Sequence, residues 1–204
     1  MLNVGLTGNV AAGKSSVADW FQAWGATIID ADAIVRSLQS AGSPMVHSIA
    51  EALGNEMIAT DGSLDRRRVR QLVTNDADAL RALNAIVHPA VQSRRAALLE
   101  EARRRGDRIV VNDIPLLFEA TDPAAFDVIV LVDAPSNLRK DRLVRKRGLS
   151  PEEADLLIAA QDPSGPKRSR SHFVIDNAGT PAELERAARS IWQELEARAG
   201  ADSA

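Results

Sequence analysis

Short apolar runs alternate with segments of helical periodicity along the chain. The runs expected to form strands cover residues 2–7, 26–30, 108–114, 127–133 and 173–176. Their nearly continuous apolar character is typical of strands buried on both faces of a parallel sheet. Strands separated by helices in this way predict an α/β fold.

The first expected helix covers residues 14–24 and ends at Gly25. Its apolar side chains recur at i, i+3, i+4 and i+7 and are Val17, Trp20, Phe21 and Trp24. Aromatic residues at helical spacing indicate core packing rather than a stacking surface for a ligand.

Residues 31–106 have helical periodicity throughout, which predicts a helical insertion between the second and third strands. A serine followed by proline at 43–44 marks one helix start. The helices expected in this block cover residues 44–53, 66–74, 76–86 and 89–105.

The C-terminal part contains a basic segment, residues 139–147, followed by the capping-box pattern at 150–153. Proline, serine and glycine at 162–171 predict a loop. A second capping box at 180–183 starts the last expected helix, which runs to about residue 198.

Composition narrows the class of protein. The chain has 204 residues, 45% of them hydrophobic, with a formal net charge of −3, which fits one compact core with a small insertion and no nucleic-acid partner. It has no cysteine, which excludes disulfides, thiol nucleophiles and cysteine-ligated metals. Because no apolar run approaches the roughly 18 residues of a membrane span and no signal peptide is evident, we expect a cytoplasmic protein without a membrane partner. We expect a monomer or a small homo-oligomer.

Residues 8–15, Gly-Asn-Val-Ala-Ala-Gly-Lys-Ser, fit the P-loop pattern and lie between an apolar strand and an amphipathic helix. In such a loop, backbone amides surround a phosphate, and the helix N-terminus favours the negative charge. The Lys14 ammonium can reach the β- and γ-phosphates, and the Ser15 hydroxyl can ligate Mg²⁺. The motif therefore predicts nucleoside triphosphate binding.

The P-loop predicts triphosphate binding but does not determine how the triphosphate is used. A switch GTPase should carry D-x-x-G and N-K-x-D; residues 176–179 match the first, but near the C-terminus, and the second is absent. A motor ATPase usually has two acids ending a strand. Asp113 could contact a magnesium-bound water, but no second acid follows it.

A small kinase also needs a base and a mobile positive charge. Asp30 and Asp32 follow the second strand, at the sheet edge where ligands bind; either could be a base, or could merely cap the following helix. On a helix, Arg142, Arg145 and Lys146 share one face, which could close over ATP or could be a solvated surface.

Several blocks together resemble the dephospho-coenzyme A kinase family over about residues 2–195. They are Gly-Leu-Thr-Gly at 5–8, Ile-Asp-Ala-Asp at 29–32, Asp-Gly-x-x-Asp-Arg at 61–66, Ile-Val-His-Pro at 86–89 and Pro-Leu-Leu-Phe-Glu at 115–119. Such a protein transfers the γ-phosphoryl group of ATP to the 3′-hydroxyl of dephospho-CoA, the last step of coenzyme A biosynthesis. The alternatives are another small-acceptor kinase of this fold and a nucleotide-dependent regulatory protein with a protein partner.

The resemblance implies an adenylate-kinase-like P-loop fold with a five-stranded parallel sheet. Residues 1–31, 107–137 and 171–204 would form the nucleotide-binding core. Residues 32–106 would bind dephospho-CoA, and residues 138–170 would form a lid.

The resemblance also implies roles for individual residues. Asp32 would be the catalytic base, with Lys14 and Arg142 acting on the ATP phosphates. The residues implied in ATP binding are Gly8, Asn9, Val10, Ala11, Ala12, Gly13, Lys14, Ser15, Ser16, Arg142 and Asn177. Those implied in dephospho-CoA binding are Asp32, His88, Pro115, Leu116, Leu117, Phe118 and Glu119.

The chain departs from the family pattern at several positions. Asn9 and Ala11 replace two P-loop glycines, and we expect Ala11 to have a negative φ. Arg139 stands where glutamine is usual, and Lys146 where a second arginine is usual. Because lysine cannot bind phosphate in a bidentate way, Arg142 is the stronger candidate for a phosphate contact.

Overall fold

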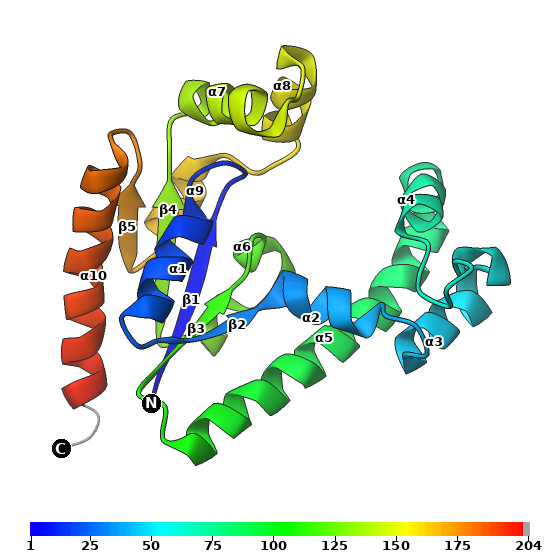
Figure 1. Ribbon diagram of the computed structural model, residues 1–204, viewed down its shortest axis with the longest axis horizontal. Helices are drawn as coiled ribbons and strands as arrows, with labels where there is room; N and C mark the ends of the chain where they lie inside the picture. The colour runs from blue at the N-terminus through cyan, green and yellow to red at the C-terminus, as the bar shows by residue number, and fades with distance from the viewer. Residues whose placement is uncertain (202–204) are drawn as a thin grey trace. The chain divides into compact units, whose positions relative to one another are not determined.

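The computed structural model describes residues 1–201 and divides the chain into two compact units (Figure 1). The sheet unit consists of Met1–Ile29 and the chain from Ala102 onward, and the helical unit consists of Asp30–Glu101. Residues 202–204, the end of the predicted core segment, lie outside the described residues. No helix among residues 1–201 is both long and apolar enough to cross a membrane.

A five-stranded sheet with the order β2-β3-β1-β4-β5 forms the centre of the sheet unit. Its strands are β1 (Leu2–Gly8), β2 (Thr27–Asp30), β3 (Ile109–Asp113), β4 (Val128–Asp133) and β5 (Phe173–Asp176). The strands are parallel; Val4, for example, pairs with Val111 on one side and with Val128 on the other. The predicted α/β class and the five parallel strands are therefore confirmed.

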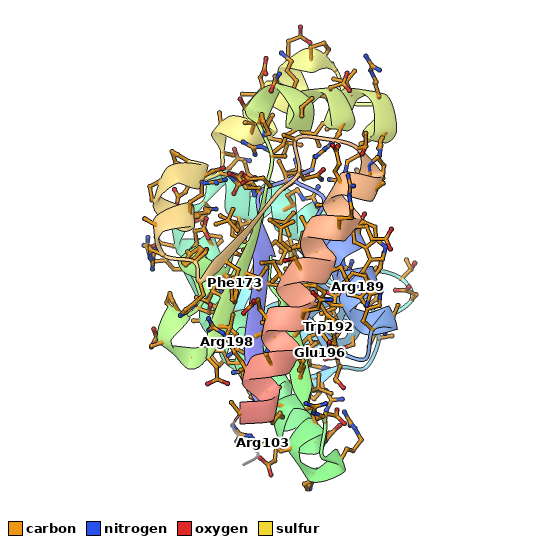
Figure 2. The ribbon with its side chains drawn as sticks, turned by 90° about the vertical axis from the view of Figure 1, so that its left-hand side faces the viewer. Arg103, Phe173, Arg189, Trp192, Glu196 and Arg198 are labelled. Atoms are coloured by element: carbon orange, nitrogen blue, oxygen red, sulfur yellow. The ribbon has the colours of Figure 1, made fainter. Side chains whose placement is uncertain are left out.

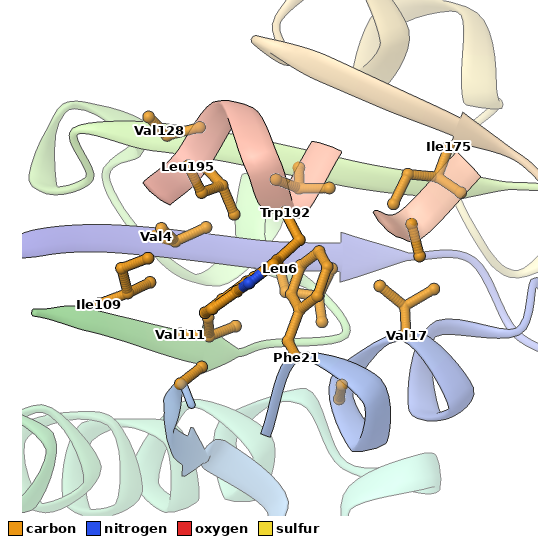
Figure 3. Packing of buried hydrophobic residues seen from close by; sticks show 14 of the residues in the cluster. Val4, Leu6, Val17, Phe21, Ile109, Val111, Val128, Ile175, Trp192 and Leu195 are labelled. Atoms are coloured by element: carbon orange, nitrogen blue, oxygen red, sulfur yellow. The ribbon is translucent and has the colours of Figure 1, made fainter. Parts of the chain in front are cut away.

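Helices α1 (Lys14–Ala23) and α10 (Pro181–Ala201) pack their apolar faces on the core of this sheet. Phe21 and Trp192 are buried there, with ring centroids 5.5 Å apart (Figure 3). The guanidinium of Arg189 lies 3.7 Å from the ring centroid of Trp24. Figure 2 shows Arg189 near Trp192 along α10. Of the aromatic residues predicted to be core, Phe21 is buried, and Trp20 and Trp24 are partly buried against the same cluster.

The remaining helices of the sheet unit follow β3 and β4. They are α6 (Leu117–Ala120), η2 (Pro123–Ala125), α7 (Ser136–Arg147), α8 (Pro151–Ala159) and α9 (Ser164–Ser169). The capping box predicted at Ser150 and Glu153 is present at the start of α8. The loop predicted over 162–171 is wrong, because α9 forms within it. Contacts from Lys167 and Arg168 to acidic side chains hold this short helix in place despite its proline and glycine.

The helical unit has its own apolar cluster, which includes Ile49, Met57 and Val69. Its elements are α2 (Ala31–Leu38), α3 (Pro44–Leu53), η1 (Asn55–Met57), α4 (Arg66–Asn75) and most of α5 (Ala77–Arg105). Two helices were predicted at 76–86 and 89–105, but the structure has one helix that continues through Pro89. Proline in a helix interior costs about 3 kcal/mol, and burial of side chains from both sides of Pro89 against one cluster offsets that cost.

Candidate active site

The P-loop joins the carboxyl end of β1 to the first turn of α1, as the sequence predicts. Gly13, just before α1, has a φ of 101°, and a Cβ there would collide with the side-chain amide of Asn177. Only glycine therefore fits at this position. Asn177 also fixes the loop by donating a 2.7 Å hydrogen bond from Nδ2 to the carbonyl of Ala12.

The negative φ expected for Ala11 is wrong, since its φ is 59°. Among residues 1–201 it is the only residue other than glycine with a positive φ. A left-handed conformation costs a residue with a Cβ about 1–2 kcal/mol. The path of the P-loop thus imposes the left-handed conformation even though alanine stands where glycine is common.

Each of the two cations predicted to act on ATP contacts protein groups in this structure. The Lys14 ammonium forms an ion pair with the Asp113 carboxylate. The Arg142 guanidinium donates to the Ala11 carbonyl at 3.2 Å and to both the backbone and side-chain oxygens of Asn177 at 3.0 Å. The α7 arginine is therefore attached directly to the P-loop.

A pocket of about 470 Å³, called here the P-loop pocket, lies beside these residues. It is lined by Ala11, Gly13, Ser15, Ser16, Trp20, Asp141, Arg142, Lys146, Arg147, Asn177, Gly179, Pro181 and Leu184. The structure thus brings together several residues predicted for ATP binding that are distant in the sequence. Trp20, whose partly exposed side chain contributes to this wall, was predicted only as a core residue.

Asn9, at the second position of the P-loop, belongs to a second polar network. Its Oδ1 accepts a 2.9 Å hydrogen bond from Lys167 Nζ, and its Nδ2 donates to Ser164 Oγ at 3.2 Å. Lys167 is only 3% exposed and also pairs with Glu119 at 2.6 Å. The side chain that replaces a family glycine therefore attaches the P-loop to α9.

The segment predicted to bind the acceptor, 115–119, follows β3. Leu117 is fully buried and Leu116 is exposed. The Arg170 guanidinium lies 4.6 Å from the ring centroid of Phe118. Glu119 is engaged by Lys167, and the Pro115 carbonyl accepts a hydrogen bond from Thr7. Sequence reasoning missed Lys167, because a lysine in an apparent loop carries no signal of burial without its partner.

Two arginines near the end of β4 differ in their environments. Hydrogen bonds to Asp176 and Asp133 raise the pKa of the Arg168 guanidinium above its usual value. Burial lowers the pKa of Arg139, an effect that the negative charge of Asp133 partly opposes. Arg139 is buried, and its Nε and Nη1 have no hydrogen-bond partner in the described structure.

In the helical unit, the aspartate that ends β2, Asp30, and the one two residues later, Asp32, have different contacts. Asp30 caps α2 by accepting a 3.0 Å hydrogen bond from the Ala33 amide, and it pairs with Arg36 at 3.2 Å. The Asp32 carboxylate is exposed and has neither kind of contact within residues 1–201. Capping therefore accounts for Asp30 and not for Asp32.

Asp32 lines a second pocket, of about 420 Å³, between residues of α2 and α4 within the helical unit. We call it the α2–α4 pocket. His88, which was predicted to bind the acceptor, is exposed on α5 and is not part of its wall. The structure does not bring His88 and Asp32 together in this pocket, and a role for His88 stays a prediction.

Comparison with known proteins identifies the chain. A sequence model of the dephospho-CoA kinase family matches residues 2–183. This chain belongs to the dephospho-CoA kinase family. As a member of it, the chain is an ATP-dependent kinase of coenzyme A biosynthesis whose acceptor is a small molecule.

Similar proteins support the family assignment over nearly the full length. A dephospho-CoA kinase of Streptomyces avermitilis is 41% identical over 199 residues, which cover 98% of this chain and 96% of that protein. The crystal structure of TT1252 from Thermus thermophilus has a TM-score of 0.79 at 36% identity, covering 95% and 97% of the two chains. A dephospho-CoA kinase from Campylobacter jejuni, 21% identical, shares the fold with a TM-score of 0.72 over 94% and 96%.

The oxygen donors beside the P-loop fit a magnesium ion shared with a nucleotide. Among residues 1–201, no three histidine, aspartate or glutamate side chains form a metal cluster. Mg²⁺ in kinases is commonly held by one or two side-chain oxygens together with phosphates and water. The Ser15 hydroxyl in the P-loop pocket and the Asp113 carboxylate beside Lys14 are donors of that kind.

Proposed function

We propose that this dephospho-CoA kinase transfers the γ-phosphoryl group of ATP to the 3′-hydroxyl of dephospho-CoA with Asp32 as the base. The 3′-oxygen attacks the γ-phosphorus, the bond from that phosphorus to the β–γ bridging oxygen breaks, and Asp32 accepts the hydroxyl proton. Coenzyme A and ADP are the products. The observation that supports this role is the Asp32 carboxylate, which faces a pocket without a protein partner while Asp30 caps the helix.

On the nucleotide side, the amides of residues 8–16 would surround the phosphates, and Asn177 would lie near the adenine. Lys14 would exchange Asp113 for the β- and γ-phosphates, and Arg142 would exchange the Ala11 carbonyl for a phosphate oxygen. A bound phosphate is a stronger acceptor than a carbonyl because it is charged. Both cations would then stabilise the charge that develops in the transition state.

Ser15 would hold Mg²⁺ through its hydroxyl, and Asp113 would orient a water bound to the ion. When bound, Mg²⁺ neutralises part of the charge on the β- and γ-phosphates. The Asp113 carboxylate lies next to Lys14, and a carboxylate is an acceptor for a hydrogen bond from such a water.

We propose that residues 32–106 bind dephospho-CoA, that residues 138–170 act as a lid, and that the remainder forms the nucleotide-binding core. His88 and the segment 115–119 would also contact the acceptor, Leu116 through its exposed side chain. Glu119 would position the P-loop through Lys167 and Asn9. We further propose that the enzyme is cytoplasmic, in line with the biosynthetic kinases that it resembles, and that it acts as a monomer or small homo-oligomer.

The proposal is tested by measuring ADP release with ATP and Mg²⁺ in the presence of dephospho-CoA, AMP or adenosine, and by locating the new phosphate on the product by ³¹P NMR. We expect strong stimulation by dephospho-CoA and a 3′-phosphate in the product. Greater stimulation by AMP or adenosine would reassign the acceptor. A phosphate at another hydroxyl would exclude the proposed chemistry at the 3′-oxygen.

A further inference from the structure

The α2–α4 pocket is walled by one face of each of two helices. On α2, this face contains Asp32, the partly buried Val35 and Arg36, which are spaced at i, i+3 and i+4. On α4, Arg66 and Arg70 alternate with Val69 and Val73 at i, i+3, i+4 and i+7. Both faces therefore combine charged side chains with an apolar floor, a mixture suited to a ligand that is anionic at one part and uncharged at another.

The arginines of this region differ in whether the protein neutralises them. Arg36 pairs with Asp30, and Arg68, which does not line the pocket, pairs with Asp65 at 3.3 Å. The side chains of Arg66 and Arg70 have no ion pair or hydrogen bond to any residue that the structure describes. The two arginines of α4 that line the pocket, Arg66 and Arg70, are thus the ones that no carboxylate of the described structure neutralises.

We propose that Arg66 and Arg70 bind the diphosphate of dephospho-CoA and so hold its ribose beside Asp32. Four helical residues span about 6 Å, so the two guanidiniums can each contact one of two adjacent phosphoryl groups. Arginine suits this task because its planar donors bind phosphate in a bidentate way. The apolar side chains of the pocket contact the uncharged parts of the substrate.

The chemistry of the acceptor links this site to the base. In dephospho-CoA the diphosphate and the reacting 3′-hydroxyl are attached to the same ribose, so fixing one restricts the position of the other. Asp32, Arg66 and Arg70 line the same pocket. The proposal rests on the proposed role of Asp32, and it adds positioning residues whose effect is on acceptor binding rather than on proton transfer.

The matched variants are Arg66→Ala, Arg70→Ala and Arg67→Ala. Arg67 is also exposed and lies on the same helix, but it does not line the pocket. Calorimetric titration with dephospho-CoA, in the absence of ATP, should show about tenfold weaker binding for each of the first two variants, as expected for loss of one charge-assisted contact. The affinity of the Arg67→Ala variant should equal that of the unmodified protein.

Steady-state kinetics separates positioning from chemistry. In the Arg66→Ala and Arg70→Ala variants, KM for dephospho-CoA should rise about tenfold, whereas kcat and the KM for ATP stay within about twofold. With adenosine, which lacks the diphosphate, the variants should match the unmodified protein. Arg70→Lys should recover part of the affinity, since the charge is kept and the bidentate geometry is lost.

Unchanged affinity for dephospho-CoA in the Arg66→Ala and Arg70→Ala variants would overturn the proposal. An equal loss of affinity in the Arg67→Ala variant would overturn it too, because it would indicate attraction by the overall positive charge of the helix rather than contacts in the pocket. Equal losses with adenosine would also contradict it, because adenosine has no phosphate to contact. Failure of the unmodified protein to phosphorylate dephospho-CoA would instead refute the proposed function, whatever the titrations show.

Discussion

The P-loop region of the sheet unit and the α2–α4 pocket of the helical unit differ in whether their charged side chains have partners within the protein. Around the P-loop, the ammonium of Lys14, the guanidinium of Arg142 and the ammonium of Lys167 all have protein partners. In the α2–α4 pocket, Arg36 is paired with Asp30, but the side chains of Asp32, Arg66 and Arg70 have no ion pair or hydrogen bond within the described residues. The three P-loop cations are thus held by protein contacts before any ligand binds, whereas no protein contact competes with a ligand for Asp32, Arg66 and Arg70.

The difference has consequences for how each region binds. If Lys14 and Arg142 bind the phosphates as proposed, nucleotide binding replaces existing contacts, and its net free energy is the difference between the phosphate contacts and those with Asp113, Ala11 and Asn177. Arg66 and Arg70 have no protein contact to give up, so a ligand bound to them replaces only water. Substitutions near the P-loop should therefore affect stability and catalysis together. In the α2–α4 pocket, substitutions of Arg66 and Arg70 should affect acceptor binding alone, and substitution of Asp32 should affect transfer without loss of stability.

Among substitutions in the P-loop region, Lys14→Ala is expected to have the largest effect on turnover. The variant loses a charge that stabilises the transferring group, and kcat should fall by about 10²–10³. The control is Lys140→Ala, which removes an exposed lysine paired with Asp155 outside the P-loop pocket. Initial rates of ADP formation measure both. A Lys14→Ala variant within about threefold of the control would show that the ammonium does not act in transfer.

Lys167→Met should give the largest loss of stability. It removes a lysine that is 3% exposed and leaves the Glu119 carboxylate and the side-chain oxygen of Asn9 without their cationic partner. Because Glu119 is partly exposed, we expect a loss of about 2–4 kcal/mol in the free energy of unfolding, below the full range for buried pairs. Thermal unfolding should show a midpoint lower by about 5–10 °C.

Lys140→Met is the matched control for that experiment, because its pair with Asp155 is exposed. Such pairs contribute at most about 1 kcal/mol. Equal thermal midpoints for the Lys167→Met and Lys140→Met variants would contradict the idea that the buried contacts of Lys167 with Asn9 and Glu119 stabilise the P-loop.

The smallest effect is expected from Ala11→Gly, and its sign is informative. Glycine removes the cost of the left-handed conformation at φ 59° but increases the entropy of the unfolded chain, so a gain of up to about 1 kcal/mol should remain. Ala12→Gly, at a buried neighbour with negative φ, should lose about 1–2 kcal/mol. Urea unfolding compares the two variants, and a loss of stability in both would show that Ala11 is not strained.

The sequence predicted most of the fold because its signals were local. Apolar runs identified the five strands, and the pattern at Ser150 identified the start of α8. Prediction failed where tertiary contacts override a local rule. Pro89 does not end α5, because both of its flanks pack on the same cluster. Ala11 has a positive φ, because the path of the loop determines it.

The candidate site was predicted less completely than the fold. The P-loop could be found from its motif. The residue pattern at 30–32 left Asp30 and Asp32 open as the base, the family resemblance indicated Asp32, and the structure adds that Asp30 caps α2. Arg70 belongs to a run of arginines on an exposed helix, and a run of this kind ordinarily indicates a solvated face. Its place in the α2–α4 pocket depends on α2, which is distant in the sequence.

The assignment of Asp32 as the base is tested most directly by comparing the Asp32→Ala and Asp30→Ala variants in single-turnover transfer from ATP to dephospho-CoA. The thermal midpoint of each variant is measured alongside. Loss of a general base should slow transfer in Asp32→Ala by about 10²–10⁴ without loss of stability. Loss of the cap in Asp30→Ala should cost about 1 kcal/mol of stability with transfer nearly unchanged. Near-normal transfer by Asp32→Ala, or a larger loss of transfer in Asp30→Ala, would contradict the assignment of the base.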